Sequence, residues 1–377
     1  IIAATGNNHI GIAGVAIGSR LIPIKVACDE CGTLSYGFEG IVYAADMHAK
    51  VVNCSWGQPD MYSQAEQDVV NYAYAKDCAV VAACGNNGDD SPYQKFYPAS
   101  YNHVLSVAMV DGNGNTVSGS NYNTGVDVSA PGWQIFSTIP GNGYEAGGTS
   151  NGTSFASPNA AGVVALVRQR SPNFTAGQAM EQVRVTGNPI PAISNDEDGT
   201  LENDSLRLFY EGHGAVDAFR AVTDTNTFSA RVDSITIDDN NGTGTFAPGE
   251  SGGIVLNVRN YLKPLQNLKA RMEIVQGDSF VTLHQTIVPF GPASTMQVVQ
   301  NDPAAFQVSI ANNTPPNTQV LIRVFFYDST VGYAEDYDYF SFVINPNYLD
   351  LNKNNLTVTF PSTGAIGYND PLVNQEG

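Results

Sequence analysis

Apolar residues in the first part of the chain fall into short continuous runs that alternate with stretches of helical periodicity. The continuous runs at 21–27, 51–54, 79–84 and 104–110 predict buried strands. The periodic stretches at 38–49 and 62–76 predict helices between them. This alternation favours an α/β fold with a doubly wound, mostly parallel sheet and helices on both faces. Functional residues in such a sheet gather beyond the carboxyl ends of the strands.

The pattern changes near residue 224, where helical periodicity stops. Apolar residues then alternate with polar ones, and turn clusters separate the runs with no helix between them. The alternating positions are Ile254/Leu256/Val258, Ala270/Met272/Ile274, Val320/Ile322/Val324 and Tyr339/Ser341/Val343. We therefore expect an α/β domain at 1–223 and an all-β, immunoglobulin-like sandwich at 224–346. Residues 347–377 are expected to begin a further β domain or a tail.

Composition narrows the function classes. The chain has 377 residues, of which 14% are charged, and a formal net charge of −19. This acidity argues against nucleic-acid binding, which requires a basic face, and it suits an extracellular protein with calcium-binding loops. No apolar run approaches the roughly 18 residues that a membrane span needs. We expect a secreted monomer.

The five cysteines divide into two groups. Cys54, Cys78 and Cys84 lie in apolar runs and are expected to be buried small hydrophobic residues. Cys28 and Cys31 lie in a loop and could form a disulfide or bind a metal. A zinc site would need a second pair of ligands at a matching spacing, and none occurs, so a disulfide is the better expectation.

One segment, residues 151–162, combines a candidate nucleophile with the start of an apolar helix. Its sequence is Asn-Gly-Thr-Ser-Phe-Ala-Ser-Pro-Asn-Ala-Ala-Gly, and it places Ser154 at the helix N-terminus. Unpaired N–H groups and the positive end of the helix dipole favour a developing oxyanion there. Pro158 lies within about a turn of the start, where its missing N–H is expected to cost little. The alternative interpretation is an N-cap serine on a buried helix.

The same segment resembles the nucleophile segment of the subtilisin-like serine proteases, the subtilases. Their usual pattern is Gly-Thr-Ser-Met-Ala-Ser-Pro-His-Val-Ala-Gly, and here Phe155 replaces Met and Asn159 replaces His. Residues 126–132 are similar to the family's Asp-Val-Xaa-Ala-Pro-Gly strand, and residues 212–218 to the segment that closes its catalytic domain. The resemblance covers roughly the first 220 residues and implies peptide-bond hydrolysis through an acyl-enzyme on Ser154.

The resemblance also implies an oxyanion donor and a substrate cleft. Residues 82–88 are similar to the family's Ala-Ala-Gly-Asn segment, so Asn86 would donate its side-chain NH₂ to the oxyanion. Residues 55–57 are similar to the Ser-Leu-Gly segment that holds the substrate backbone as an added strand. The implied substrate-binding residues are Ser55, Trp56, Gly57, Ala83, Cys84 and Gly85. Taken alone, both segments are ordinary turns at strand ends.

The floor of the implied specificity pocket carries a large ring. Residues 96–99, Phe-Tyr-Pro-Ala, are similar to the family's Tyr-Pro-Ala segment, and Phe96 stands at a position that is usually small. A ring there would shrink the pocket. We therefore expect small residues such as Ala to be preferred before the scissile bond.

A serine nucleophile needs a base and a group that orients the base. The family supplies them from Asp-Ser/Thr-Gly and His-Gly-Thr-His-Val-Ala-Gly segments that precede all those matched here. No such Asp occurs, and none of the five histidines lies in that context: His9, His48, His103, His213 and His284. The chain also begins without Met, so we expect it to be a fragment, inactive alone, whose Asp and His precede Ile1. An Asn-Gly-Thr sequon at 151–153 favours a bacterial source, because a glycan there would block the cleft.

Two loops are candidate calcium sites. Residues 6–16 resemble the family's calcium loop, which implies the Asn8 side chain and the carbonyls of Gly6, Ile10 and Ile12 as ligands, with further ligands upstream. Residues 239–250 match the spacing of a twelve-residue EF-hand loop without its helices. Its expected ligands are Asp239, Asn241, Thr243, the Thr245 carbonyl and Glu250. The alternative for this second loop is a Gly/Asn-rich hairpin with solvated acids.

Two functions are consistent with these observations. The first is a secreted serine endopeptidase that acts on protein or peptide substrates. The second is a non-enzymatic adhesion or binding protein built on an inactive subtilase core. An Asp-Ser/Thr-Gly and a His-Gly-Thr-His segment upstream would support the first.

Overall fold

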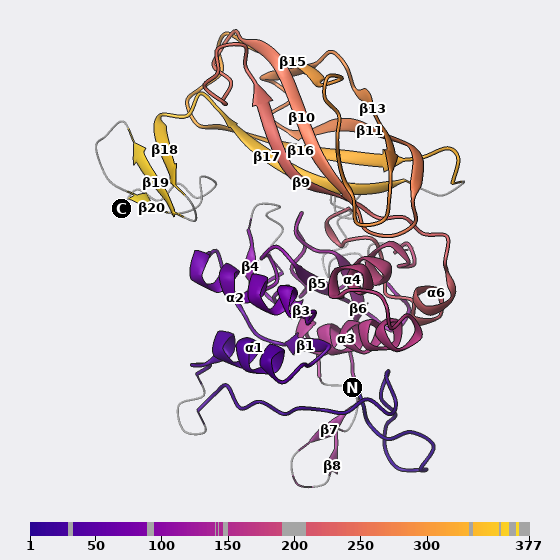
Figure 1. Cartoon of the computed structure of the whole chain (residues 1–377). Helices are drawn as coiled ribbons and strands as arrows, with labels where there is room; N and C mark the ends of the chain where they lie inside the picture. Colours follow the sequence, from indigo (N-terminus) through magenta and orange to yellow (C-terminus); the bar gives the residue numbers. More distant parts are fainter. Residues whose placement is uncertain are drawn as a thin grey trace. The chain divides into compact units, whose positions relative to one another are not determined.

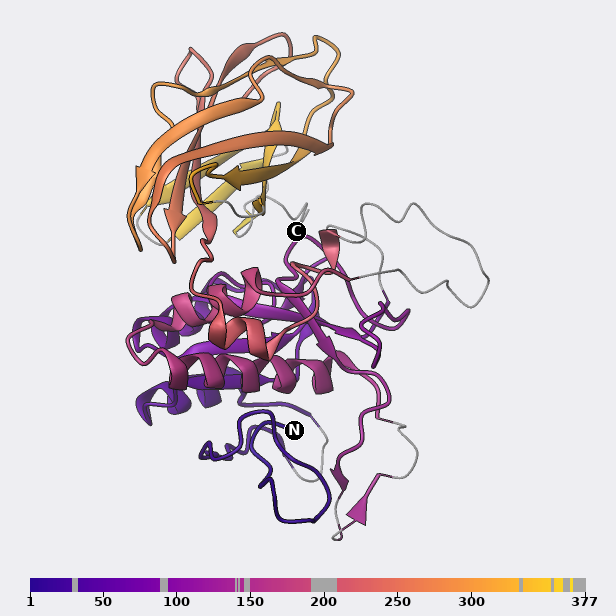
Figure 2. The same cartoon turned by 90° about the vertical axis from the view of Figure 1, so that its right-hand side faces the viewer.

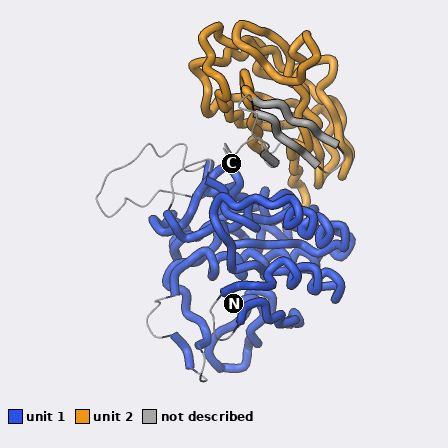
Figure 3. Tube along the Cα trace, turned by 90° about the vertical axis from the view of Figure 1, so that its left-hand side faces the viewer, with its two compact units in different colours: residues 1–224 blue, residues 225–377 orange. Residues whose placement is uncertain are grey.

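The computed structural model describes residues 1–28, 33–88, 94–139, 141, 143–145, 150–190, 209–331, 335–353, 356–361 and 367–368. The chain divides into two compact units, residues 1–224 and residues 225–377 (Figures 1 and 3). Within the described ranges, no helix is both long enough and apolar enough to cross a membrane.

A parallel sheet with the strand order β1-β3-β5-β6 lies at the centre of the first unit. Its strands are β1 (Val51–Cys54), β3 (Ala79–Ala83), β5 (Val104–Val110) and β6 (Val128–Pro131). Successive residues point to opposite faces, so Ala79 and Val81 join one core while Val80 and Ala82 join another. Since both of their faces are buried, β3 and β5 are apolar at nearly every position, as their continuous runs predicted.

Helices cover both faces of this sheet (Figures 1 and 2). α1 (Gly37–Asp46) and α2 (Gln64–Ala75) pack on one face. α3 (Thr153–Arg170), α4 (Ala176–Val185) and α6 (Ala218–Thr223) pack on the other. The helices expected at 38–49 and 62–76 are therefore present as α1 and α2. Two short ladders complete the unit: β2 (Gln58–Pro59) with β4 (Phe96–Tyr97), and β7 (Thr138–Ile139) with β8 (Gly143–Tyr144).

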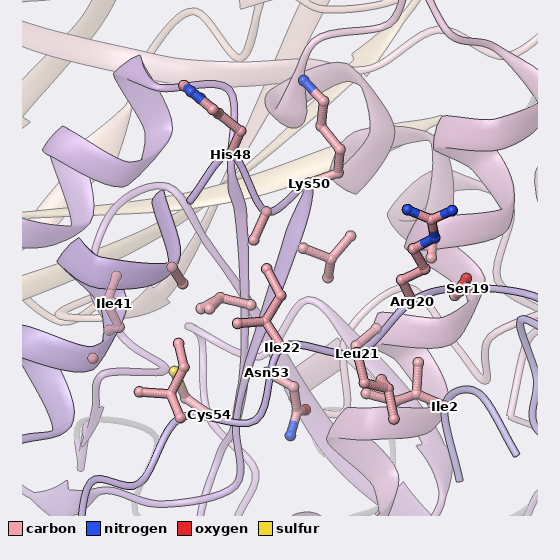
Figure 4. A pocket seen from close by; sticks show the side chains of 18 of the residues that line it. Ile2, Ser19, Arg20, Leu21, Ile22, Ile41, His48, Lys50, Asn53 and Cys54 are labelled. Atoms are coloured by element: carbon pink, nitrogen blue, oxygen red, sulfur yellow. The ribbon is translucent and has the colours of Figure 1, made fainter. Parts of the chain in front are cut away.

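The strand expected at 21–27 does not form. Among the described residues, this segment has no ladder partner apart from an isolated bridge between Ala27 and Leu34, and Leu21 is 63% exposed. An extended segment becomes a strand only beside another backbone that can bond to it. Residues 21–26 instead border a cavity of about 850 Å³ whose other walls come from β1, α1 and α3 (Figure 4).

The second unit contains two antiparallel sheets that share one apolar core. The first has the order β12-β15-β10-β14, with β9 also paired to β10, and the second has the order β13-β11-β16-β17. The strands are β9 (Ala230–Asp238), β10 (Ser251–Asn260), β11 (Leu265–Gln276), β12 (Val281–Leu283), β13 (Ile287–Ala293), β14 (Val298–Gln300), β15 (Phe306–Ile310), β16 (Thr318–Tyr327) and β17 (Asp336–Ile344). The region is thus mostly β, and the immunoglobulin-like topology remains a proposal.

Alternation identified the core face of β10 and β16 but not that of β17. Ile254, Leu256 and Val258 are fully buried, as expected. In β17, however, Phe340, Phe342 and Ile344 face the core rather than Tyr339, Ser341 and Val343. Both sets alternate and both contain apolar residues, and the larger and less polar set is the one that is buried.

The last described strands form a separate small sheet. β18 (Tyr348–Lys353), β19 (Leu356–Pro361) and β20 (Gly367–Tyr368) pair only with one another in the part of the chain that the structure describes. They belong to the compact unit 225–377. A domain boundary near residue 346 therefore stays a proposal.

Candidate active site

Ser154 lies in the first turn of α3, directly after a sharp change of backbone direction. The N-cap residue is Gly152, whose φ of 148° lies in the left-handed region that favours glycine. The Phe155 and Ala156 N–H groups both donate to the Gly152 carbonyl, at 2.9 and 3.3 Å. No acceptor in the described residues bonds the Ser154 N–H, which is one of the unpaired donors of the helix N-terminus. This N–H and the helix dipole favour negative charge beside the Ser154 side chain.

Asn86 follows β3 and is held against the start of α3. Its Oδ1 accepts hydrogen bonds from the Thr153 N–H at 2.7 Å and from the Thr153 hydroxyl at 2.9 Å. Thr153 Oγ1 also accepts from the Gly85 N–H at 3.3 Å, which ties the two segments together. Asn86 is exposed, and its Nδ2 makes no hydrogen bond with the described residues, so it can donate to a ligand while Oδ1 stays fixed.

Ser55 follows β1 and makes reciprocal contacts with Ser154. The Ser154 hydroxyl donates to the Ser55 carbonyl at 3.2 Å, and the Ser55 hydroxyl donates to the Ser154 carbonyl at 2.7 Å. Asn53 and Ser157 extend the contact: Asn53 Nδ2 donates to Ser55 Oγ at 2.9 Å, and the Ser157 hydroxyl donates to Asn53 Oδ1. The ends of β1 and β3 therefore both meet the first turns of α3, as expected for a doubly wound sheet.

The ring of Phe96 lies between the ends of these two strands. A methyl group placed on Gly57 would come within 2.5 Å of Phe96 Cε1, and one placed on Gly85 within 2.9 Å of Phe96 Cδ2. The ring thus contacts Gly57 on one side and Gly85 on the other. The structure brings Ser55, Gly57, Gly85, Asn86 and Phe96 together with Ser154 at one edge of the sheet.

Three of the expected substrate-binding side chains do not line an open cleft. Ala83 and Cys84 are almost fully buried, so only their backbone could contact a substrate. The Cys84 thiol donates to the Asn121 carbonyl at 3.1 Å, and burial raises its pKa, so it is not a nucleophile. Trp56 packs edge-on against Phe38, with ring centroids 5.2 Å apart, and lines the cavity beside β1.

The five histidines all lie in the described residues, and none is a base for Ser154. The ring of His103 stacks on Tyr74 at 4.1 Å, the ring of His213 contacts the Arg184 guanidinium, and His284 Nε2 lies 2.8 Å from Ser309 Oγ. His9 lies in the exposed loop 6–12. His48 borders the cavity beside β1, near Lys50 at one edge of it (Figure 4). The hydroxyl of Ser154 therefore has a backbone carbonyl, not a base, as its acceptor.

The cavity beside β1 is walled mainly by apolar side chains. Leu21, Ile22 and Ile41 line it together with Asn53 and Cys54 of β1 (Figure 4). Within the described residues, β1 pairs with β3 on one edge only, and the cavity lies along the other. The unpaired side of an edge strand leaves N–H and C=O groups without ladder partners.

The first candidate calcium loop is exposed and uncharged. Asn8 Oδ1 accepts a hydrogen bond from the Ile10 N–H at 3.1 Å, which closes a local turn. Asn8 and Ile10 are exposed, whereas Gly6 and Ile12 are half-buried. Residues 1–16 contain no Asp or Glu, so this loop offers oxygens of the right kind but no carboxylate for a divalent cation.

In the second candidate loop, residues 239–250, the carboxylates of Asp239 and Glu250 are both bonded to Asn241. Asp239 accepts hydrogen bonds from the Gly242 N–H at 2.7 Å and the Thr243 N–H at 2.9 Å, and also from the Thr243 hydroxyl. The Thr243 hydroxyl and these N–H groups lower the pKa of Asp239 to about 2. Asn241 bridges the carboxylates: its N–H donates to Asp239 and its Nδ2 donates to Glu250 at 2.6 Å. Among the described residues, no three His, Cys, Asp or Glu side chains gather as a metal site.

The cysteines follow the expected division. Cys28 is disulfide-bonded, and Cys54, Cys78 and Cys84 are free and buried. Cys31 lies outside the described residues.

Sequence reasoning missed three residues of the site: Asn53, Thr153 and Ser157. Asn53 and Ser157 bond to each other across 104 positions, so only the fold shows their relationship. Thr153 had a local signal, since it directly precedes the candidate nucleophile Ser154.

Comparisons with known proteins identify the family of the first unit. A family model described as "Subtilase family" matches residues 1–214. A thermophilic serine proteinase of Bacillus sp. (strain AK1) is 45% identical over 185 residues, which are 48% of this chain and 44% of that protein. Thermitase of Thermoactinomyces vulgaris is 38% identical over 223 residues, 59% of this chain and 72% of that protein. Among solved structures, a protease of Pseudoalteromonas arctica PAMC 21717 aligns with a TM-score of 0.48 and 30% identity, covering 59% of this chain and 67% of that one.

Proposed function

The chain belongs to the subtilase family, and we propose that it carries the nucleophile and an oxyanion site of a secreted serine endopeptidase. One observation supports this most directly: the Ser154 hydroxyl, the unpaired Ser154 N–H and the anchored amide of Asn86 lie together at the start of α3. A nucleophile beside two neutral donors is the arrangement that acyl transfer requires.

These groups act in both halves of the proposed reaction, the formation of the acyl-enzyme and its hydrolysis. Ser154 Oγ attacks the carbonyl carbon of the peptide bond, and the oxygen that becomes negative accepts hydrogen bonds from the Ser154 N–H and Asn86 Nδ2. The carbon–nitrogen bond breaks, the amine leaves with the proton that Ser154 gave up, and an ester remains on Ser154. Water then attacks the ester carbon, the bond from that carbon to Ser154 Oγ breaks, a proton from the water returns to Oγ, and the acid leaves. Both proton transfers require a base that the contacts of Ser154 do not include.

We propose that this base, a His oriented by an Asp, comes from sequence that precedes Ile1. Two features support this proposal: one edge of β1 has no strand partner among the described residues, and an apolar cavity lies along it. A further parallel strand would pair with β1 and fill the cavity. Such a strand would also give residues 21–26 the neighbour that they lack. Its carboxyl end would lie beside those of β1 and β3, close to Ser154.

We propose that substrates carry a small residue before the scissile bond. The acyl group on Ser154 must lie between the ends of β1 and β3, because Ser154 contacts Ser55 and Thr153 contacts Gly85. The Phe96 ring already fills the space between Gly57 and Gly85. A large substrate side chain would clash with that ring, whereas Ala would not.

Secretion and calcium binding are parts of the same proposal. The net charge of −19 and the disulfide at Cys28 support an extracellular location. For calcium, the loop 239–250 fits better than the loop 6–12, because it brings two carboxylates, Asp239 and Glu250, onto one bridging residue. Their oxygens are bonded to N–H and O–H donors, which calcium would have to displace, so binding would be weak, about 10⁻⁴–10⁻³ M.

A fluorophosphonate probe tests whether Ser154 is the nucleophile. The probe forms a bond between its phosphorus and the attacking oxygen, and fluoride leaves. In the longer natural protein, meaning this chain with the sequence that precedes it, we expect the added mass on the peptide that contains Ser154 and none in Ser154→Ala. A folded longer protein that remains unlabelled would favour the alternative function, a binding protein on an inactive core.

A further inference from the structure

Pro158 removes a hydrogen bond from the residue that carries the nucleophile. In an α-helix, each carbonyl accepts from the N–H four residues further on. For Ser154 in α3, that residue is Pro158, which lies inside the helix and has no N–H. The proline ring also presses against the carbonyl four residues before it and turns that carbonyl outward. The Ser154 carbonyl therefore needs a donor from outside the helix.

Ser55 supplies that donor. Its hydroxyl lies 2.7 Å from the Ser154 carbonyl oxygen, although the two residues are 99 positions apart in the chain. The direction of this bond is fixed, because Asn53 Nδ2 donates to Ser55 Oγ at 2.9 Å and leaves the hydroxyl hydrogen for Ser154. Asn53 is itself held by the Ser157 hydroxyl. A chain of three hydrogen bonds thus begins at Ser157 of α3, passes through the end of β1 and returns to α3.

We propose that Ser55 is a positioning residue for Ser154, acting through the carbonyl that Pro158 leaves unpaired. The bond fixes the first turn of α3 against the end of β1 and keeps Ser154 Oγ within 3.2 Å of the Ser55 backbone. Without the hydroxyl, the first turn keeps its bonds to Asn86 but loses this bond to the end of β1, so the Ser154 Oγ and N–H are held less firmly in their positions. The proposal rests on Ser154 being the nucleophile. It assigns to the Ser55 side chain a role distinct from backbone contact with substrate.

A double-mutant cycle isolates this role. Ser55→Ala removes the outside donor, and Pro158→Ala restores an N–H that can donate to the same carbonyl within the helix. If the Ser55 hydroxyl acts through that carbonyl, Ser55→Ala should lower kcat when Pro158 is present. The same change should lower kcat much less in the Pro158→Ala background. Ser55→Thr keeps a hydroxyl and should recover most of the rate that Ser55→Ala loses. Ser63→Ala is the matched control, because the Ser63 side chain makes no cap hydrogen bond.

Two measurements quantify the double-mutant cycle: peptide turnover and the melting temperature. In the longer natural protein, turnover of an Ala-containing chromogenic peptide should show kcat falling about tenfold in Ser55→Ala with KM nearly unchanged. In Ser55→Ala/Pro158→Ala, kcat should return to within about threefold of Pro158→Ala alone. In the 377-residue chain, the fall in melting temperature caused by Ser55→Ala should likewise shrink in the Pro158→Ala background.

Each outcome decides between positioning and mere packing. An equal loss of kcat in both backgrounds, or no loss in Ser55→Ala, would overturn the proposal. If no form of the longer protein turns over peptide, the proposed function fails, and the melting temperatures still decide whether Ser55 and Pro158 are coupled. Additive melting-temperature changes would then overturn the coupling as well.

Discussion

Thr153 donates two hydrogen bonds to one oxygen of Asn86, from its N–H at 2.7 Å and from its hydroxyl at 2.9 Å. An amide oxygen bonded twice cannot rotate without losing both bonds. The NH₂ group of Asn86 is therefore set in one direction before any substrate arrives. Fixed donors of this kind stabilise a developing oxyanion without having to reorganise during the reaction.

Replacing Asn86 should slow the chemical step more than it weakens substrate binding. In the longer natural protein, we expect Asn86→Ala to lower kcat by about 10²–10³-fold with little change in KM, a magnitude that was established on subtilisin itself. Thr153→Val should lower kcat less, because it removes the anchoring hydroxyl and keeps the N–H. Asn87→Ala, at the adjacent exposed position, is the control. A rise in KM at constant kcat for Asn86→Ala would show that Asn86 binds substrate instead.

Phe96 should set the preference for the residue before the scissile bond. A peptide library should show Ala preferred over Phe in the longer protein, and Phe96→Gly should raise kcat/KM for Phe by about 10–200-fold. Phe136→Ala removes a half-exposed ring outside the strand ends and should leave the preference unchanged. Wild-type preference for Phe or Tyr would mean that the ring does not occupy the pocket.

Asp77 should make the first unit less stable at low pH. Burial raises the pKa of this carboxyl, but hydrogen bonds from Arg168, Lys50 and the Ala176 N–H lower it below its usual value. Because the folded pKa is below the unfolded one, the stabilisation is complete above about pH 4 and is lost as pH falls through the folded pKa.

We expect Asp77→Asn to lower the melting temperature at pH 7 by about 2–8 °C, equivalent to about 1–2 kcal/mol after allowance for solvent screening. The reason is that Arg168, whose side chain is only 7% exposed, loses its carboxylate. The difference between variant and wild type should shrink at pH 3. Asp68→Asn, which alters an exposed contact with Gln64, should change little at either pH. A difference that stays constant with pH would contradict the assignment to Asp77 ionisation.

Calcium should stabilise the second unit through the loop 239–250. Adding calcium to several millimolar should raise the melting temperature of the wild-type chain, because binding to the folded state alone shifts unfolding by mass action. Glu250→Ala should abolish the shift, and Asp278→Ala, in a different turn, should preserve it. No shift in the wild type, or an equal shift in Glu250→Ala, would make the loop an ordinary turn held by its own hydrogen bonds.

Much of the first unit follows from local patterns. The strands β1, β3 and β5 were predicted from continuous apolar runs, because a strand covered on both faces buries every position, as β3 and β5 do. The strand expected at 21–27 is wrong for the opposite reason: the run is apolar, but strand formation needs a neighbour that the described chain does not supply. In β17, the pattern correctly predicted the alternation of a strand but not which set of alternating residues faces the core.

The site likewise contains residues that the sequence predicted and a relationship that it did not. Ser154 and Asn86 could be named from sequence because each lies in a recognisable segment. The effect of Pro158 could not, since the sequence alone suggested that its missing N–H was harmless. Only the fold shows that the missing bond belongs to Ser154 and that Ser55, on another element, replaces it.

The most direct test of the account is peptide turnover by four proteins. They are the 377-residue chain, the longer natural protein, and the Ser154→Ala variant of each, all measured with a chromogenic peptide that carries Ala before the scissile bond. We predict that the longer protein turns over the peptide and that its Ser154→Ala variant does not. The 377-residue chain should match its own Ser154→Ala variant, because its Ser154 donates to a backbone carbonyl rather than to a base. Enzymatic turnover by the 377-residue chain that disappears in Ser154→Ala, or an inactive longer protein, would contradict the account.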